Sequence, residues 1–239
     1  MYQAAPIPLP VLKQSNVKEA EEVQLEVEEE AAAFSELEPT SRLLITRKFE
    51  TKKALTFKGI INNFEVKTPD DVQFYKVVEL SKWTGYFCLG LRPFKLKVLD
   101  TNNEEIFKVK RSFACTSKVL PCQLQRAVVY TKDKFLGSID QVWTALAPEY
   151  LVKDEEGIEL YRITGSPYIL GFFEDTIFRI EMMDGTSVGA TCKRWRGLVH
   201  WLFKSPIEDY FGAAYDRELN TGHKVLLLAA TFLIDYMYH

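Results

Sequence analysis

An alternation of apolar and polar residues with a period of two constrains the fold of this chain most. In the stretch RPFKLKVLD, Phe94, Leu96 and Val98 alternate with Lys95 and Lys97, and the apolar pattern resumes after a polar DTNNEE segment. This alternation is typical of a strand with one buried face, and two such runs around a polar segment indicate a hairpin. The sequence therefore predicts β-structure in this region.

The same pattern recurs further along the chain. It is found in EYLVKDEEGIELYRI, where DEEG forms the polar interruption, and in TIFRIEMMDGTSVGATCKRW. In the second stretch Asp184-Gly185 is a pair that favours the positive φ angles of tight hairpin turns. Short strands separated by turn signals about every ten residues predict a mainly β fold, either a barrel or a sandwich.

The C-terminal stretch KVLLLAATFLIDYMYH predicts an apolar helix. Val225–Tyr238 contains 14 residues, roughly 21 Å as a helix, whereas the ~30 Å core of a bilayer requires about 20. A carboxylate at the bilayer centre costs at least ~2.5 kcal/mol, which makes Asp235 unfavourable there. A membrane-spanning helix stays an alternative, but the sequence favours a helix buried inside a barrel. The residues assigned to this membrane or core helix are Val225, Leu226, Leu227, Leu228, Phe232, Leu233, Ile234 and Asp235.

Composition divides the chain at about residue 35. Residues 1–35 include the acidic stretch QSNVKEAEEVQLEVEEEAAA, which has no aromatic residue, so we expect a disordered tail. The opening residues lack the basic start and apolar run of a secretory signal, which predicts a protein facing the cytosol with reduced thiols. The net charge of −3 gives no global attraction to nucleic acid, and none is predicted as a partner.

The sequence offers little support for covalent catalysis. It has three histidines and lacks G-x-S-x-G, H-E-x-x-H and P-loop motifs. No two cysteines form a Cys-x-x-Cys pair, which argues against a zinc site. We therefore predict no catalytic residue.

Several segments resemble the phospholipid scramblase family. These are RPFKLKVLD through RSFACTSKVLPCQLQ, then FEDTIFRIEMMDGTSVGATCKRWRGL, and DYFGAAYDREL followed by the terminal FLIDYM string. The resemblance covers about residues 34–239. It implies a closed antiparallel tubby-like β-barrel of about a dozen strands over residues 36–239, wrapped around a C-terminal helix at about 222–238.

The resemblance also implies a function. Family members are described as moving phospholipids between bilayer leaflets without ATP and in response to calcium. It implies a phospholipid membrane as partner, a location at the cytoplasmic face of the plasma membrane, and a further nuclear pool. The alternative is a membrane-surface lipid-binding or adaptor protein, whose helix stays in the barrel and which has no intrinsic transport.

Calcium is the cofactor that the resemblance implies. The family's loop, carried onto IEDYFGAAYDRE, places Ile207 at the first ligand position, where the family usually has Asp. With two carboxylates in register, we expect only weak binding. An ordinary acidic loop with a turn at Gly212 is the alternative. The implied calcium ligands are Asp209, Phe211, Ala213, Tyr215 and Glu218.

Two further groups would contact a membrane by resemblance. Cys115 and Cys122 stand where many scramblases have a palmitoylated cysteine-rich run, and unmodified thiols are the alternative. The basic stretch CKRWRG matches a segment discussed as a nuclear-import signal, and its charges and indole would also suit anionic headgroups. A solvated basic strand end is the alternative. The residues of this predicted contact are Lys193, Arg194, Trp195 and Arg196.

Overall fold

The computed structural model describes residues 34, 37–48, 63–80, 93–114, 123–132, 134–167, 176–193 and 209–237. The chain divides into two compact units, Met1–Ser35 and Glu36–His239. Apart from Phe34, the first unit lies outside the described residues, so the predicted disorder of residues 1–35 stays a prediction. All that follows concerns the second unit.

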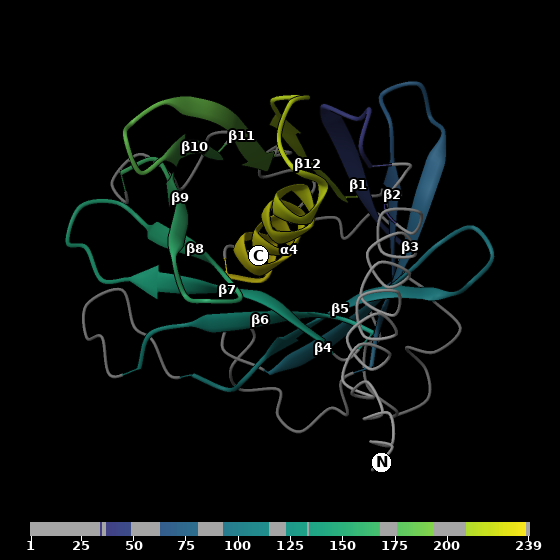
Figure 1. The fold of residues 1–239 in the computed structure, drawn as a ribbon, viewed down its shortest axis with the longest axis horizontal. Helices are drawn as coiled ribbons and strands as arrows, with labels where there is room; N and C mark the ends of the chain where they lie inside the picture. The colour runs from purple at the N-terminus through teal and green to yellow at the C-terminus, as the bar shows by residue number, and fades with distance from the viewer. Residues whose placement is uncertain are drawn as a thin grey trace, which may run out of the picture. The chain divides into compact units, whose positions relative to one another are not determined.

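The described strands of the second unit form a closed antiparallel barrel (Figure 1), which confirms the predicted fold class. Each strand pairs with its neighbours in sequence, and β1 closes the barrel by pairing with β12. The strands are β1 (Arg42–Lys48), β2 (Asn63–Lys67), β3 (Gln73–Glu79), β4 (Phe94–Leu99), β5 (Glu105–Arg111), β6 (Arg126–Thr131), β7 (Lys134–Val142), β8 (Glu149–Asp154), β9 (Glu159–Thr164), β10 (Thr176–Met182), β11 (Ser187–Lys193) and β12 (Asp209–Tyr215).

The predicted hairpins are present, and their sequences explain them. In β4 the buried residues Phe94, Leu96 and Val98 face the interior, while the lysines between them are partly exposed. The turns use residues that tolerate positive φ, such as Gly157 at 85° and Gly185 at 88°. The alternation of apolar and polar residues and the turn residues therefore together determine where the strands and hairpins form.

The up-and-down topology gives the barrel two distinct ends. Odd-numbered strands run toward one end, where β1, β3, β5, β7, β9 and β11 finish, and we call this the open end. Even-numbered strands finish at the opposite end, where short turns lead to the next odd strand, and we call this the turn end. Every connection between consecutive strands therefore belongs to one end or the other.

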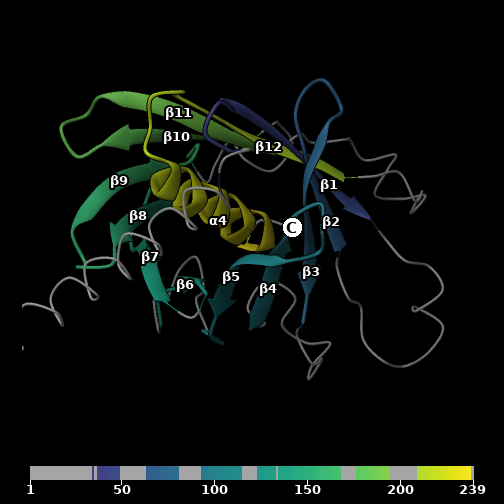
Figure 2. The same ribbon diagram turned by 45° about the vertical axis from the view of Figure 1, so that its right-hand side comes forward.

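The helix α4 (Thr221–Met237) lies inside the barrel (Figures 1 and 2), as predicted for a barrel wrapped around a C-terminal helix. It begins at the turn end, where the Asn220 Oδ1 accepts a hydrogen bond of 2.8 Å from the Gly222 N–H. Every residue from Lys224 to Tyr236 is buried. Within the described part of the chain, no helix combines the length and apolar character needed to cross a bilayer.

Close packing of β7 against β8 and the helix requires glycine at one position. A Cβ atom on Gly137 of β7 would lie 2.2 Å from the Lys153 carbonyl oxygen and 2.9 Å from Leu226 Cδ2. The helix therefore fills the barrel closely, and its apolar side chains form the core with the inward-facing residues of the strands.

Candidate functional site

A buried ion pair fixes the C-terminal end of α4. The Arg47 guanidinium of β1 donates a hydrogen bond to the Asp235 carboxylate, and the two side chains are only 4% and 2% exposed. The guanidinium carbon also lies 5.2 Å from the centroid of the Phe64 ring. Buried charges are tolerated in a protein interior when they are paired in this way.

Two further polar contacts hold the last residues of the helix. The Tyr236 hydroxyl donates to Glu79 Oε2 over 2.9 Å, and Arg111 Nη2 lies 3.1 Å from the Met237 sulfur. We call Arg47, Glu79 and Arg111, with the helix residues that they contact, the polar clasp. All three strand residues of the clasp lie at the open end, so the clasp joins the end of the helix to three separate strands.

The clasp was not predicted, although the sequence contains a signal for it. In β1, Leu43 and Ile45 are buried, and Arg47 follows with the same period of two. Glu79 in β3 and Arg111 in β5 likewise each follow two buried apolar residues on the inward face of their strand. A charged residue that continues the inward face of a strand indicates a buried polar contact.

Lys224 plays a similar part at the turn end. It is fully buried, and its ammonium group donates to the backbone oxygens of Leu37, Glu38 and Arg217. Burial lowers the pKa of Lys224, while the nearby carboxylates of Glu38 and Asp216 oppose this shift. The lysine thereby links the first turn of the helix to the segment that precedes β1.

His223 forms the other polar contact at the start of α4. Its Nδ1 lies 2.7 Å from the Tyr161 hydroxyl of β9, and the two rings pack edge to face. Burial lowers the pKa of His223, against an opposing effect of the Asp154 carboxylate on β8. Burial also raises the pKa of Tyr161, so the phenol stays neutral. The imidazole is therefore favoured in its neutral form.

We expect acid to weaken this contact. Because the folded pKa of His223 lies below the unfolded value of about 6.5, its contribution to stability is fully present above pH 6.5. That contribution is lost as the pH falls through the folded pKa. A positive charge near the N-terminus of α4 is also opposed by the helix dipole.

Denaturant titrations of wild type and His223→Gln between pH 5 and 7 measure the effect. The free energy of unfolding of the wild type should decrease more steeply toward low pH, because glutamine does not titrate. Parallel pH profiles for the two proteins would contradict this expectation.

The residues predicted as a calcium loop form a strand instead. Asp209–Tyr215 is β12, which pairs with β1 and β11. Phe211, Ala213 and Tyr215 are buried in the barrel, and burial raises the pKa of the Tyr215 phenol. Glu218 lies beyond the strand in an exposed turn. At ~3.3 Å per residue the strand separates Asp209 from Tyr215 by ~20 Å, so it does not gather these residues around one ion. Calcium binding here stays a prediction.

The predicted lipidation and basic sites fall mostly outside the described residues. Cys115, Cys122, Arg194, Trp195 and Arg196 are not described, and Lys193 is the last residue of β11. The described residues that flank them, Ala114, Gln123 and Lys193, adjoin the open-end termini of β5, β6 and β11. Both predicted membrane contacts are therefore attached through strands to the same end of the barrel.

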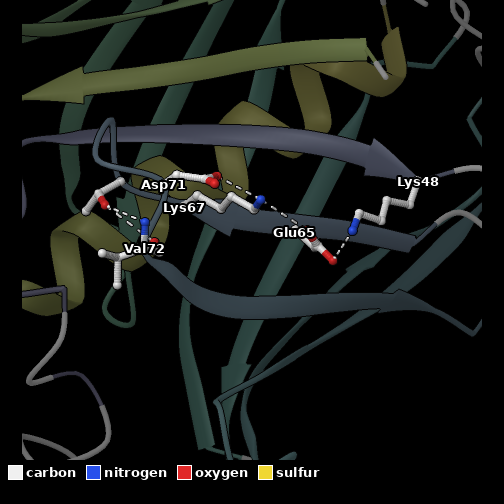
Figure 3. A network of polar contacts seen from close by, with 6 residues as sticks. Lys48, Glu65, Lys67, Asp71 and Val72 are labelled. Carbon is white, nitrogen blue, oxygen red and sulfur yellow. Dashed lines mark hydrogen bonds and ion pairs between the residues drawn. The ribbon is translucent and has the colours of Figure 1, made fainter. Parts of the chain in front are cut away.

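The outer face of β1 and β2 carries a row of ion pairs (Figure 3). Glu65 pairs with Lys48 and lies 3.6 Å from Lys67, which in turn lies 2.9 Å from the exposed Asp71. Exposed pairs of this kind contribute ~0–1 kcal/mol each. We interpret this row as a solvated surface. Among the described residues, no cluster of three or more potential metal ligands is found.

Comparison with known proteins relates the whole barrel to one family. The family model described as Scramblase matches residues 21–239. Phospholipid scramblase 2 of Bos taurus is 29% identical over 200 residues, which cover 82% of this chain and 68% of that protein. Phospholipid scramblase 1 of Mus musculus is 28% identical over 82% of this chain and 60% of its own length. Phospholipid scramblase 1 of Homo sapiens is 26% identical over 84% and 64%.

The chain thus spans about three fifths to two thirds of the length of these curated relatives. No solved structure is significantly similar to it.

Proposed function

The chain belongs to the Scramblase family, and from this premise we propose that it moves phospholipids between the leaflets of a bilayer. In this proposal the movement is bidirectional and needs no ATP, and the protein acts at the cytoplasmic face of the plasma membrane. The family match carries the proposal, because it includes every described strand and the whole of α4. A lipid path needs only a polar surface or a thinned bilayer for the headgroup, rather than covalent chemistry.

Calcium responsiveness is part of the proposal. Glu218 is an exposed carboxylate of the predicted ligand set, and Asp216 lies beside it in the same turn, where its Oδ1 accepts from the Glu218 N–H at 3.3 Å. With so few carboxylates, we expect an affinity at the millimolar end of the range for calcium sites. Glu218→Ala should weaken binding in a calorimetric titration, whereas titration curves identical to wild type would remove Glu218 as a ligand.

The position of α4 favours a second candidate function. The helix is buried on all sides and held by the polar clasp, which supports a protein that stays folded at the membrane surface and moves no lipid. In that case Cys115 and Cys122 would anchor it, and the Lys193–Arg196 segment would contact anionic headgroups or an import receptor that maintains a nuclear pool.

Reconstitution in liposomes separates the two candidates. Purified protein is incorporated into vesicles with a fluorescent phospholipid, and leaflet exchange is measured with and without calcium. We expect exchange that increases with the amount of protein and with millimolar calcium. Lipid exchange that does not depend on calcium would support transport and contradict the calcium site. No exchange, from protein shown to be folded in the vesicles, would favour the surface-binding candidate.

A further inference from the structure

The described connecting residues at the two ends of the barrel differ in charge. The turn end carries exposed carboxylates in the turns from β2 to β3, β4 to β5, β8 to β9 and β10 to β11, and in the turn that leads to α4. Lys132 and Arg217 are also exposed at this end, but the carboxylates outnumber them, so the end is net acidic and is repelled by anionic headgroups. These exposed acidic residues are Asp70, Asp71, Glu104, Glu155, Glu156, Asp184, Asp216 and Glu218.

The described connecting residues of the open end are Leu80, Pro93, 112–114, 123–125, 143–148 and 165–167, and none of them is charged. Exposed charged residues that are described at this end include Lys48 and Arg126, at the ends of β1 and β6. Besides Leu80 (44%), which follows β3, four large apolar side chains here are exposed to solvent: Phe113 (51%), Leu124 (39%), Trp143 (52%) and Leu146 (76%). We call these four residues the open-end patch. Large apolar side chains gathered at one place on a surface mark an interaction site.

Register places the patch on neighbouring strands. Arg111 of β5 pairs with Ala127 of β6, so Phe113 follows β5 where Leu124 precedes β6. The β6–β7 pairing continues beyond the strand, since the Gln141 N–H donates to the Gln125 oxygen over 2.8 Å. Trp143 follows directly, and Leu146 lies in the same connection to β8. The patch therefore occupies the rim formed by β5, β6 and β7.

We infer that the open-end patch docks the barrel onto the surface of a phospholipid bilayer, with the acidic turn end facing away from it. The inference rests on the proposed function for the choice of a membrane as the partner. Trp is enriched at membrane interfaces, because its ring is apolar and its N–H can still reach water, and leucine and phenylalanine insert into the acyl boundary. None of the described connecting residues at this rim carries a carboxylate, which anionic headgroups would repel.

This orientation has a consequence for the helix. The polar clasp and the patch lie at the same end, so docking would bring the C-terminal end of α4 toward the membrane. Arg111 of the clasp is only two residues before Phe113 of the patch. Docking through the patch would thus place the clasp near the site where lipid moves.

Binding to vesicles tests the inference. Full-length protein is floated with vesicles of phosphatidylcholine and phosphatidylserine, and the bound fraction is titrated against lipid. The Trp143→Ser/Leu146→Ser variant should bind at least about tenfold more weakly, because each buried apolar side chain adds on the order of one decade of affinity. The conservative Trp143→Phe/Leu146→Phe variant should bind like wild type.

The turn end supplies a matched control. Ile158 and Met183 are also exposed, by 55% and 42%, so Ile158→Ser/Met183→Ser removes two exposed apolar side chains from the opposite end and should leave binding within about twofold of wild type. Circular dichroism and thermal unfolding check that all variants fold. The inference would be overturned if both double variants lost equal vesicle affinity, or if the open-end variant bound vesicles like wild type. It would also be overturned if wild type bound no vesicles, a result that would point to a protein partner.

The lipid-exchange assay separates a failure of the docking inference from a failure of the proposed function. Wild type that binds through the patch but exchanges no lipid would contradict transport and leave the docking inference standing. Lipid exchange that is unaffected in the open-end variant, together with unchanged vesicle binding, would contradict docking through the patch and leave transport standing.

Discussion

Replacement of Asp235 by alanine should lower the free energy of unfolding by about 3–5 kcal/mol, because it leaves the buried Arg47 guanidinium without this carboxylate. Both side chains are almost fully buried, so water cannot take the place of the lost partner. Urea denaturation followed by circular dichroism measures the change. A loss below about 1 kcal/mol would contradict the view that the ion pair holds the end of the helix.

A double variant tests the cause of that loss. Arg47→Met/Asp235→Leu removes both charges and keeps apolar volume, so it should be closer to wild type than Asp235→Ala alone. Lipid exchange in the same proteins links the clasp to function. If α4 must leave the barrel for transport, Asp235→Ala should exchange lipid faster per folded molecule. If the intact barrel is the active form, exchange should fall in proportion to the folded fraction.

Replacement of Phe232 by alanine should have an effect of similar size, about 3–5 kcal/mol. The ring is fully buried at the centre of the barrel, with centroids 5.5 Å from Phe64 and 6.0 Å from Phe211. Those contacts join α4 to β2 and β12, so truncation removes aromatic contacts and leaves a cavity that the barrel wall cannot close. The midpoint of urea denaturation should shift to much lower concentration.

Phe113→Ala is the matched control for this substitution. Phe113 is 51% exposed at the open end, so the same chemical change should alter the free energy of unfolding by no more than about 0.5 kcal/mol. Equal losses from the two substitutions would contradict the interpretation of α4 as the centre of the core.

Patterns within short segments were sufficient to predict a mainly β fold and an apolar C-terminal helix, whereas the closed barrel around that helix was implied by the family resemblance. Alternation in segments such as Phe94–Leu99 requires a strand with one buried face, and Asp184-Gly185 requires a tight turn. The apolar segment around Val225 is too short to cross a bilayer and too apolar to be exposed. The observed helix, Thr221–Met237, begins one residue before the expected range of about 222–238, and residue 238 lies outside the described residues.

Long-range pairing could not be predicted in the same way. The partners Arg47 and Asp235 are 188 positions apart, and only the closed register of the strands brings them together. In the β12 segment, by contrast, the local pattern was informative. Its buried residues Phe211, Ala213 and Tyr215 alternate with Gly212 and Ala214, which is a strand pattern. The resemblance to a calcium loop gave no indication of this strand, which the local period of two does indicate.

The closure of β1 onto β12 determines when this domain can fold. Arg42 pairs with Ala214, so ~170 residues must be synthesised between the two strands, which takes about 9–34 s at ~5–20 residues per second. During this time β1 presents an unpaired edge, and the helix that fills the barrel is made later still. We therefore expect the barrel to form after synthesis of α4, as a slow folding reaction of high contact order that depends on protection of its edges from aggregation.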